Sequence, residues 1–246
     1  MTIADHVLLD EPTDDEVKEA SILPFPQLLG VIQFPAAFTK LEMRFAVSTL
    51  SRFRGKWGVK HFKAALKALE YGYATRKFGL KYTTPKDVSL VNTLVAYADS
   101  GFGIPRSQGA RLIIMNGAAI SFSSKRHTTT DDSTTAAELT ELFMCSSDVE
   151  GLRSLMDEVG LHQELPTTIF QDNLPAIQIS QNRGSLAKKT RAMSLRTLSV
   201  RNKIEDGKVN SKFTPTDGMI ADIGTKPLET ARFQKLRDIM TGYSVE

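Results

Sequence analysis

The stretch LVAYADSGFGIPRSQGARLIIMNGAAISFSSK, residues 94–125, has the pattern of three successive β-strands. Its first two strand segments are near-continuous apolar runs, and the third alternates, with Ile120 and Phe122 on one face. Asn116-Gly117 separates the last two segments, which is a strong signal for a tight hairpin turn. The stretch therefore predicts an antiparallel meander of three strands.

The elements that follow the meander complete the predicted fold. A long amphipathic helix over residues 135–159 ends at Gly160, because glycine readily adopts the backbone conformation that ends a helix. A short strand, a basic helical region reaching about residue 204, a last strand and a closing amphipathic helix come next. The order β-β-β-α-β-α-β-α predicts an α/β, ribonuclease H-like mixed sheet, in which an antiparallel meander joins parallel strands and helices flank the sheet.

The chain before the meander has a different character. Apolar residues at spacings of three and four from residue 24 to residue 80 predict a small helical segment. Residues 1–23 have little periodicity and much negative charge, which favours an acidic lead-in or linker. We therefore expect three parts: the lead-in over 1–23, the helical segment over 24–88 and the ribonuclease H-like domain over 89–246.

Composition limits the classes of protein that fit the chain. The 246 residues are 41% hydrophobic, which is enough for a sizeable core. No run approaches the roughly 18 apolar residues of a membrane span, and the first 25 residues are acidic where a signal peptide begins basic. Cys145 is the single cysteine, so an internal disulfide and a cysteine-based zinc site are excluded. We expect an intracellular protein of the cytoplasm or nucleus, with no membrane partner.

The net charge of +3 is unevenly distributed. The first 21 residues carry seven acids against one base, whereas the segment between Asp172 and Glu205 contains seven bases and no acid. A second basic stretch runs from Arg52 to Lys67. Such patches suit a polyanion, although a single basic patch is also typical of a solvated helix face.

Four acidic residues are predicted to meet at one edge of the sheet, namely Asp99, Glu138, Asp172 and Asp222. Asp99 and Asp172 end strands, Glu138 begins the long helix, and Asp222 follows the last strand. Strand ends and helix starts converge at the edge where open sheets place their sites. Carboxylates packed together repel one another unless a cation lies among them, and Mg²⁺ prefers such oxygen ligands. The set predicts a site for two Mg²⁺ ions, with Mn²⁺ as the alternative.

Each carboxylate also has a structural explanation. Glu138, three residues after Thr135, fits a capping box, and Asp172 could cap the helix that follows it. Asp99 before Ser-Gly fits turn chemistry. Asp222 alone carries little information, and Asp217 nearby is its rival.

From about Pro26 to Met240 the chain resembles the C-terminal part of the Pol polyprotein of copia-type LTR retrotransposons, covering the tail of the reverse transcriptase and its ribonuclease H. Five motifs in order carry the resemblance: AYADSGFG, AISFSSKRH, STTAAEL, FQDNLPAI and ADIGTKPL. The last is the most specific. The upstream helices, QLLGVIQF and HFKAALKALEYGYATRKFGLKY among them, resemble the segment between the polymerase palm and the ribonuclease H.

The resemblance implies that Asp99, Glu138, Asp172 and Asp222 are the metal-binding catalytic set. It implies cleavage of the RNA strand of an RNA/DNA hybrid, a polymerase portion as partner, and a virus-like particle as the location if the element is active. The expected nucleic-acid contacts are Asn173 in the minor groove and the backbone contacts Lys188, Lys189, Arg191 and Arg201. A polymerase site is disfavoured, since Ser100 follows Asp99 where a polymerase has a second Asp.

The chain departs from the family pattern around these motifs. Gly101 and Phe102 stand where a second acid and a Trp are usual, and Ala136 and Leu139 replace a Glu and a Tyr. A histidine expected before the last strand is missing from Lys188–Ser194, and Leu41-Glu42 replaces Pro-Asp. Two further hypotheses therefore stand beside the nuclease. One is a non-catalytic, nucleic-acid-binding remnant of the same element, and the other is a module whose helical segment docks on a polymerase domain.

Overall fold

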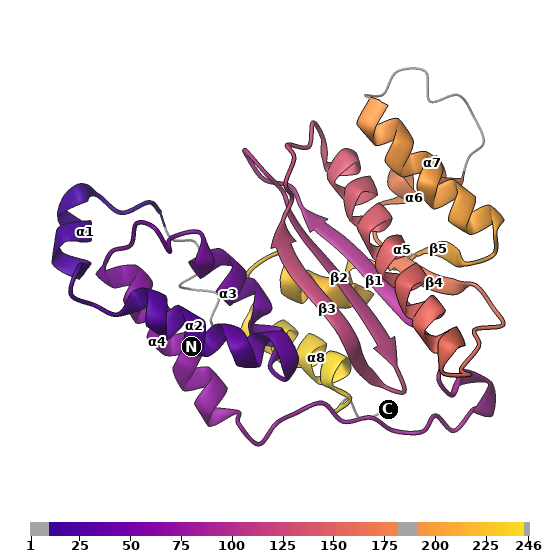
Figure 1. Cartoon of the computed structure of the whole chain (residues 1–246), viewed down its shortest axis with the longest axis horizontal. Coiled ribbons are helices and arrows are strands. Elements are labelled where there is room, and N and C mark those ends of the chain that lie inside the picture. Colours follow the sequence, from indigo (N-terminus) through magenta and orange to yellow (C-terminus); the bar gives the residue numbers. More distant parts are fainter. Residues whose placement is uncertain (1–9, 182–190, 244–246) are drawn as a thin grey trace.

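The computed structural model describes residues 10–181 and 191–243, and within them it contains one mixed sheet of five strands (Figure 1). The strands are β1 (Val95–Gly101), β2 (Gln108–Met115), β3 (Ala118–Arg126), β4 (Thr167–Gln171) and β5 (Val209–Phe213). Their order is β3-β2-β1-β4-β5. β1, β2 and β3 are antiparallel neighbours, whereas β4 is parallel to β1 and β5 to β4. The ribonuclease H-like fold predicted from the element order is confirmed.

The turn between β2 and β3 has the geometry that the sequence predicts. Asn116 and Gly117 both adopt positive φ angles, 52° and 84°. A two-residue hairpin turn of this kind matches the twist of the strands that it joins, and asparagine and glycine tolerate it best. The turn pairs Ile114 with Ala119, and a shift of register between Ile113 and Ile114 then pairs Leu112 with Phe122.

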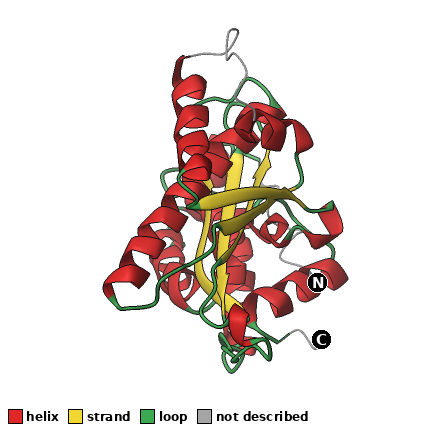
Figure 2. Cartoon of the chain, turned by 90° about the vertical axis from the view of Figure 1, so that its right-hand side faces the viewer, coloured by secondary structure: helices red, strands yellow, loops and turns green. Residues whose placement is uncertain are grey.

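Helices cover both faces of the sheet, as two perpendicular views show (Figures 1 and 2). One face carries α5 (Thr134–Glu158) with α6 (Leu174–Gln181) and α7 (Arg191–Glu205) beside it, over a core that includes Leu142, Val149 and Ile169. The other face carries the 3-10 helix η5 (Ile220–Gly224) and α8 (Thr230–Thr241), over Leu112, Phe122 and Met240.

The segment before the sheet is helical, as predicted. It contains α2 (Phe25–Phe38), α3 (Arg44–Ser51) and α4 (Val59–Ala74), and the short 3-10 helix η2 (Leu41–Met43) lies between α2 and α3. These helices enclose a core of their own around Phe25, Ile32 and Ala65. They also rest on the sheet, since α3 packs against β3 and Leu41 belongs to the core beneath η5 and α8. The boundary at residues 88 and 89 stays a prediction.

The described part of the acidic lead-in is more ordered than a linker. Residues 14–20 form α1 (Asp14–Ala20), which begins with a reciprocal capping box between Thr13 and Glu16. Ala20 at its end is fully buried. The weak periodicity concealed this helix because its stability comes from its cap and from the contact with α4, not from a long apolar stripe.

No single helix in residues 10–181 and 191–243 is both long and apolar enough to cross a membrane. Among the helices of this described part, α1 and α2 satisfy the length and composition of a span only when taken together, and the chain bends by 80° between them.

Candidate metal centre

Three carboxylates from three separate elements meet at one edge of the sheet. Asp99 lies near the end of β1, Asp172 directly follows the parallel neighbour β4, and Glu138 lies in the second turn of α5. One oxygen from each of these side chains lies within 4.8 Å of one from each of the others. Parallel strands bring their carboxyl ends to the same edge, which explains why residues so distant in sequence converge.

Asp99 is part of a strand and not of a turn. β1 continues to Gly101, and Asp99 pairs with Ala110 of β2. The side chain is 5% exposed and accepts a short hydrogen bond from the hydroxyl of Thr225, just after η5. The alternative explanation of this residue as turn chemistry is therefore wrong.

Glu138 is buried at the start of α5 without serving as its cap. Ser133 is the N-cap residue, and its hydroxyl accepts a hydrogen bond from the Ala136 amide at 3.2 Å. Glu138 instead accepts hydrogen bonds from the Ser100 amide at 3.3 Å and from the Gln171 side-chain amide at 3.0 Å. These bonds fix the carboxylate against the ends of β1 and β4.

Asp172 is the most accessible of the three carboxylates. The cap of α6 is provided by its neighbour Asn173, whose side-chain oxygen accepts a hydrogen bond from the Ala176 amide at 2.9 Å. Asp172 is half-buried and accepts a hydrogen bond from the Thr216 hydroxyl at 3.1 Å. It therefore forms the solvent-facing side of the cluster.

The electrostatics of the cluster favour a bound cation. Burial raises the pKa of Asp99, and the nearby charges of Asp222 and Asp172 raise it further against the opposing bond from Thr225. Burial likewise raises the pKa of Glu138, and repulsion by Asp99 and Asp172 adds to the effect. The three buried or half-buried carboxylates repel one another and cannot all be ionised unless a cation lies among them. Their oxygens are the ligands that a hard divalent cation prefers. The residues fit such an ion.

Asp222, the fourth predicted ligand, lies close by in η5 but is engaged elsewhere. It is fully buried, forms a short ion pair with Arg232 and contacts the Lys226 ammonium at 2.6 Å. Its oxygens are not among those that lie within 4.8 Å in the cluster. Its negative charge nevertheless acts on Asp99. Its role as a ligand stays a prediction.

The predicted nucleic-acid contacts have mixed positions. Asn173 is half-buried beside Asp172 and uses its side-chain oxygen for the cap of α6. Arg201 on α7 donates to the carbonyl of Ile179 at 2.7 Å, which joins α7 to α6. Lys188 and Lys189 lie outside the described residues, as does the side chain of Arg191. The role of these residues as nucleic-acid contacts stays a prediction.

Two supporting residues escaped the sequence reasoning. Gln171 is fully buried and donates to both the backbone carbonyl and a carboxylate oxygen of Glu138, at 2.9 and 3.0 Å. Thr225 holds Asp99. Both belong to motifs quoted above, so the signal was present: a polar residue within the buried strand segment IFQ, and a threonine next to the predicted ligand Asp222.

The fold and the carboxylates define the class of the domain, an α/β domain of the ribonuclease H-like type. No protein-family model matches the chain. Its homologues are retrovirus-related Pol polyproteins from transposons, as the motifs indicated. The polyprotein of transposon RE1 from Arabidopsis thaliana is 26% identical over 211 residues, a match that covers 84% of this chain and 14% of the polyprotein. That of TNT 1-94 from Nicotiana tabacum is 24% identical over 250 residues and is matched along 98% of this chain.

The chain thus spans less than a fifth of the length of these two polyproteins, 14% and 18%. Among solved structures, the chain is similar to LC11-RNase H1 in complex with an RNA/DNA hybrid, with a TM-score of 0.43 and 14% identity. That match covers 54% of this chain and 94% of the solved chain.

Proposed function

We propose that the chain is the ribonuclease H portion of a retrotransposon Pol polyprotein and that it hydrolyses the RNA strand of RNA/DNA hybrids. The observation that carries the proposal is the convergence of Asp99, Glu138 and Asp172 at the sheet edge. Homology to Pol polyproteins supports the assignment to a retrotransposon.

Asp99, Glu138 and Asp172 would hold the divalent cations, Mg²⁺ or Mn²⁺. When bound, two such ions activate water and stabilise the leaving oxygen in phosphodiester hydrolysis. The chain supplies the positioning: Gln171 and the Ser100 amide orient Glu138, and Thr225 orients Asp99. The half-buried Asp172 forms the side of the site open to a substrate phosphate.

Asp222 is the proposed fourth carboxylate. It pairs with Lys226 and Arg232, so ligation of a cation requires one of these ion pairs to open. Its buried charge already contributes to the negative potential at Asp99. We therefore expect Asp222 to strengthen cation binding whether or not it ligates directly.

The proposed substrate is a hybrid duplex whose RNA strand crosses the carboxylates. Contacts to 2′-hydroxyls would distinguish RNA from DNA, with Asn173 beside Asp172 as a minor-groove contact. The basic residues Lys188, Lys189, Arg191 and Arg201 would contact backbone phosphates. The polymerase portion of the same polyprotein is the proposed protein partner.

The alternative is a remnant that binds nucleic acid without cleaving it. Neighbouring motif residues depart from the family at Gly101, Phe102, Ala136 and Leu139. The carboxylates and their hydrogen-bond partners nonetheless still meet in one cluster. This retained geometry favours the nuclease.

A cleavage assay on a hybrid labelled separately in each strand tests the proposal. We expect Mg²⁺-dependent cleavage of the RNA strand alone, and a loss of at least about a hundredfold in Asp172→Asn, because loss of an outer-shell partner of a metal already costs 10- to 100-fold. The matched control is Asp217→Asn. This acid was the rival of Asp222, but it is exposed and is not among the described carboxylates that meet in the cluster, so the variant should retain activity. Equal activity of wild type and Asp172→Asn, or none in either, contradicts the proposal.

A further inference from the structure

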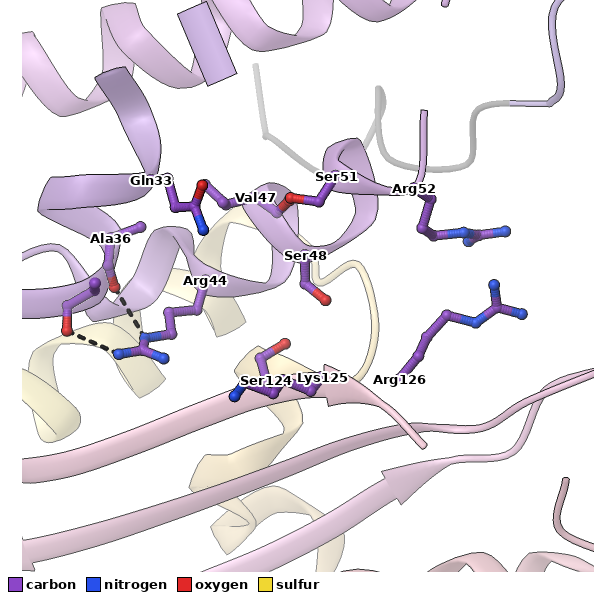
Figure 3. A pocket seen from close by; sticks show the side chains of 11 residues that line it. Gln33, Ala36, Arg44, Val47, Ser48, Ser51, Arg52, Ser124, Lys125 and Arg126 are labelled. Carbon is purple, nitrogen blue, oxygen red and sulfur yellow. Dashed lines mark hydrogen bonds between the residues drawn. The ribbon is translucent and has the colours of Figure 1, made fainter. Parts of the chain in front are cut away.

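A basic cleft lies between the helical segment and the edge of the sheet (Figure 3). Its volume is about 420 Å³, and its walls come from α2, α3 and the end of β3. Because β3 is the outermost strand of the sheet, the cleft is formed where the helical segment covers this edge.

Four cationic residues line the cleft: Arg44, Arg52, Lys125 and Arg126. The side chain of Arg126 stands on the same face of β3 as Ser124, whereas that of Lys125 stands on the opposite face, because side chains alternate along a strand. Among the described residues that line it, none is acidic. Arg44, at the start of α3, is already engaged with α2, since it donates to the carbonyls of Ala36 and Ala37 at 3.0 and 2.8 Å.

Arg52 and Arg126 extend side by side at one end of the cleft, from the ends of α3 and β3 (Figure 3). Within residues 10–181 and 191–243, neither they nor Lys125 form an ion pair with an acid. Burial lowers the pKa of Arg126, and the charges of Arg52 and Arg106 lower it further. Unpaired, mutually repelling cations around a cavity favour a bound anion.

The cleft lies at the same end of the strands as the carboxylates, although β3 is the outermost strand and β1 the central one. The register places Asp99, Ala110 and Ser124 in one row across β1, β2 and β3. Neighbouring strands are about 4.8 Å apart, so the cleft begins about 10 Å from Asp99, which equals the axial rise of about three nucleotides.

Hydrogen bonds join the two places. Ser124 at the cleft donates to the carbonyl of Gly224 at 2.7 Å, and Thr225, the next residue, holds Asp99. Gln108 donates to Ser124 at 2.9 Å and to Ser48 of α3 at 3.3 Å. The cleft wall is therefore fixed relative to the carboxylates and not merely near them.

We propose that this cleft binds a backbone phosphate of the nucleic acid, a few nucleotides from the one at the carboxylates, with Arg52 and Arg126 as the ligands. The inference rests on the proposed nucleic-acid substrate but not on its cleavage. It assigns to the helical segment a direct part in holding the duplex.

A methylphosphonate scan of the hybrid tests the cleft. Affinity is measured in the cleavage-blocked Asp172→Asn chain, with one neutral methylphosphonate at a time in either strand. We expect one position or two adjacent positions, a few nucleotides from the phosphate at the carboxylates, to weaken binding about tenfold, as loss of a charge-assisted contact does. Arg52→Gln/Arg126→Gln in the same background should bind unmodified hybrid about tenfold more weakly. This variant should also bind the hybrid equally well with or without a methylphosphonate at that position.

The matched control is Lys77→Gln/Lys235→Gln, which removes two exposed cations outside the cleft. It should bind like its parent and keep the same sensitive position. Melting temperatures of all variants verify that they are folded. The inference is overturned if Arg52→Gln/Arg126→Gln loses as much affinity as its parent at every methylphosphonate position. It is also overturned if inorganic phosphate binds in the cleft while the double substitution leaves the affinity for hybrid unchanged. If the scan gives the expected pattern but the wild-type chain cleaves no hybrid, the proposed nuclease is contradicted and the phosphate site in the cleft is still supported.

Discussion

At the scale of single residues, the most constrained charges outside the carboxylate cluster surround His127. This side chain is almost fully buried, with its two ring nitrogens 2.7 Å from Asp131 and 3.0 Å from Glu141. Arg111 also contacts Glu141, at 3.1 Å. Burial alone lowers the pKa of His127, but the hydrogen bonds and charges of Glu141 and Asp131 outweigh it and raise the pKa.

A raised pKa of His127 makes stability depend on pH with a definite sign. The folded state holds the imidazolium more tightly than the unfolded state, so the stabilisation is full below about pH 6.5 and is lost as pH rises through the folded pKa. We expect His127→Gln to lower the free energy of unfolding by about 3 kcal/mol at pH 6, because it leaves the buried Asp131 without a cationic partner and Glu141 with Arg111 alone. The difference should shrink toward pH 9.

Urea unfolding at several pH values measures this effect. The control is His162→Gln, which changes an exposed histidine paired with Asp157 and should have little effect at any pH. An equal loss for His127→Gln at pH 6 and pH 9 contradicts the role of the charged imidazole.

The carboxylate cluster predicts a pH-dependent response to metal. The raised pKa values of Asp99 and Glu138 mean that the metal-free folded chain binds more protons than the unfolded chain, so its stability falls as pH rises. Mg²⁺ bound at the proposed site would replace those protons. We expect saturating Mg²⁺ to raise the melting temperature more at pH 8 than at pH 6, and Asp99→Asn to remove most of the increase. An Mg²⁺ effect independent of pH and of Asp99 contradicts the site.

At the scale of elements, the sequence predicted helix α5 correctly but not the residue that caps its start. The sequence predicted the helix to within a residue or two, because its apolar stripe is long. The capping-box alternative at Thr135 and Glu138 was wrong, since Ser133 caps the helix. Serine and threonine are both common N-cap residues, so the sequence alone does not choose between Ser133 and Thr135. The choice depends on how α5 packs against β1.

The assigned cap predicts a clear asymmetry between two neighbouring residues. Ser133→Ala should lower the free energy of unfolding by about 1 kcal/mol, because the Ala136 amide loses its partner. Thr135→Ala, within the helix, should cost less. Chemical unfolding compares the two variants, and a greater loss at Thr135 would restore the capping-box explanation.

The close approach of η5 to the sheet predicts another contrast. A Cβ at Gly224 would lie 2.7 Å from the Ala110 side chain and 2.8 Å from the Phe122 ring, whereas one at Gly151 in α5 meets nothing within 4 Å. We expect Gly224→Ala to destabilise by about 1–3 kcal/mol. Gly151→Ala should stabilise by about 0.5–1 kcal/mol, since alanine favours a helix. Thermal unfolding measures both, and a neutral Gly224→Ala contradicts the tight contact.

At the scale of the whole molecule, periodicity and element order were sufficient to predict the architecture. The convergence of Asp99, Glu138 and Asp172 followed from the same order, because parallel strand ends share an edge. The ion pairs of Asp222 could not be predicted, since Lys226 and Arg232 reach it only through the conformations of η5 and α8. The basic cleft escaped notice because it forms between α3 and β3, whose docking the sequence does not specify.

The docking of the helical segment is itself testable through Leu41. This residue is 5% exposed and belongs to the core formed with η5 and α8. Leu41→Ala should lower the free energy of unfolding by about 2–5 kcal/mol. It should also speed hydrogen exchange in β3, the strand under α3. Leu66→Ala, at a half-exposed position of α4, is the control. Unchanged exchange in β3 contradicts coupling between the helical segment and the sheet.

Whether the three carboxylates form a divalent-cation site is decided by one titration. Mn²⁺ bound to the whole chain can be counted by the loss of the free-ion electron paramagnetic resonance signal, in wild type and in Glu138→Gln. We predict saturable binding to the wild-type chain that competes with Mg²⁺ and is strongly weakened by Glu138→Gln. Binding of equal strength in the two chains, or none in wild type, would contradict the metal centre and with it the proposed nuclease.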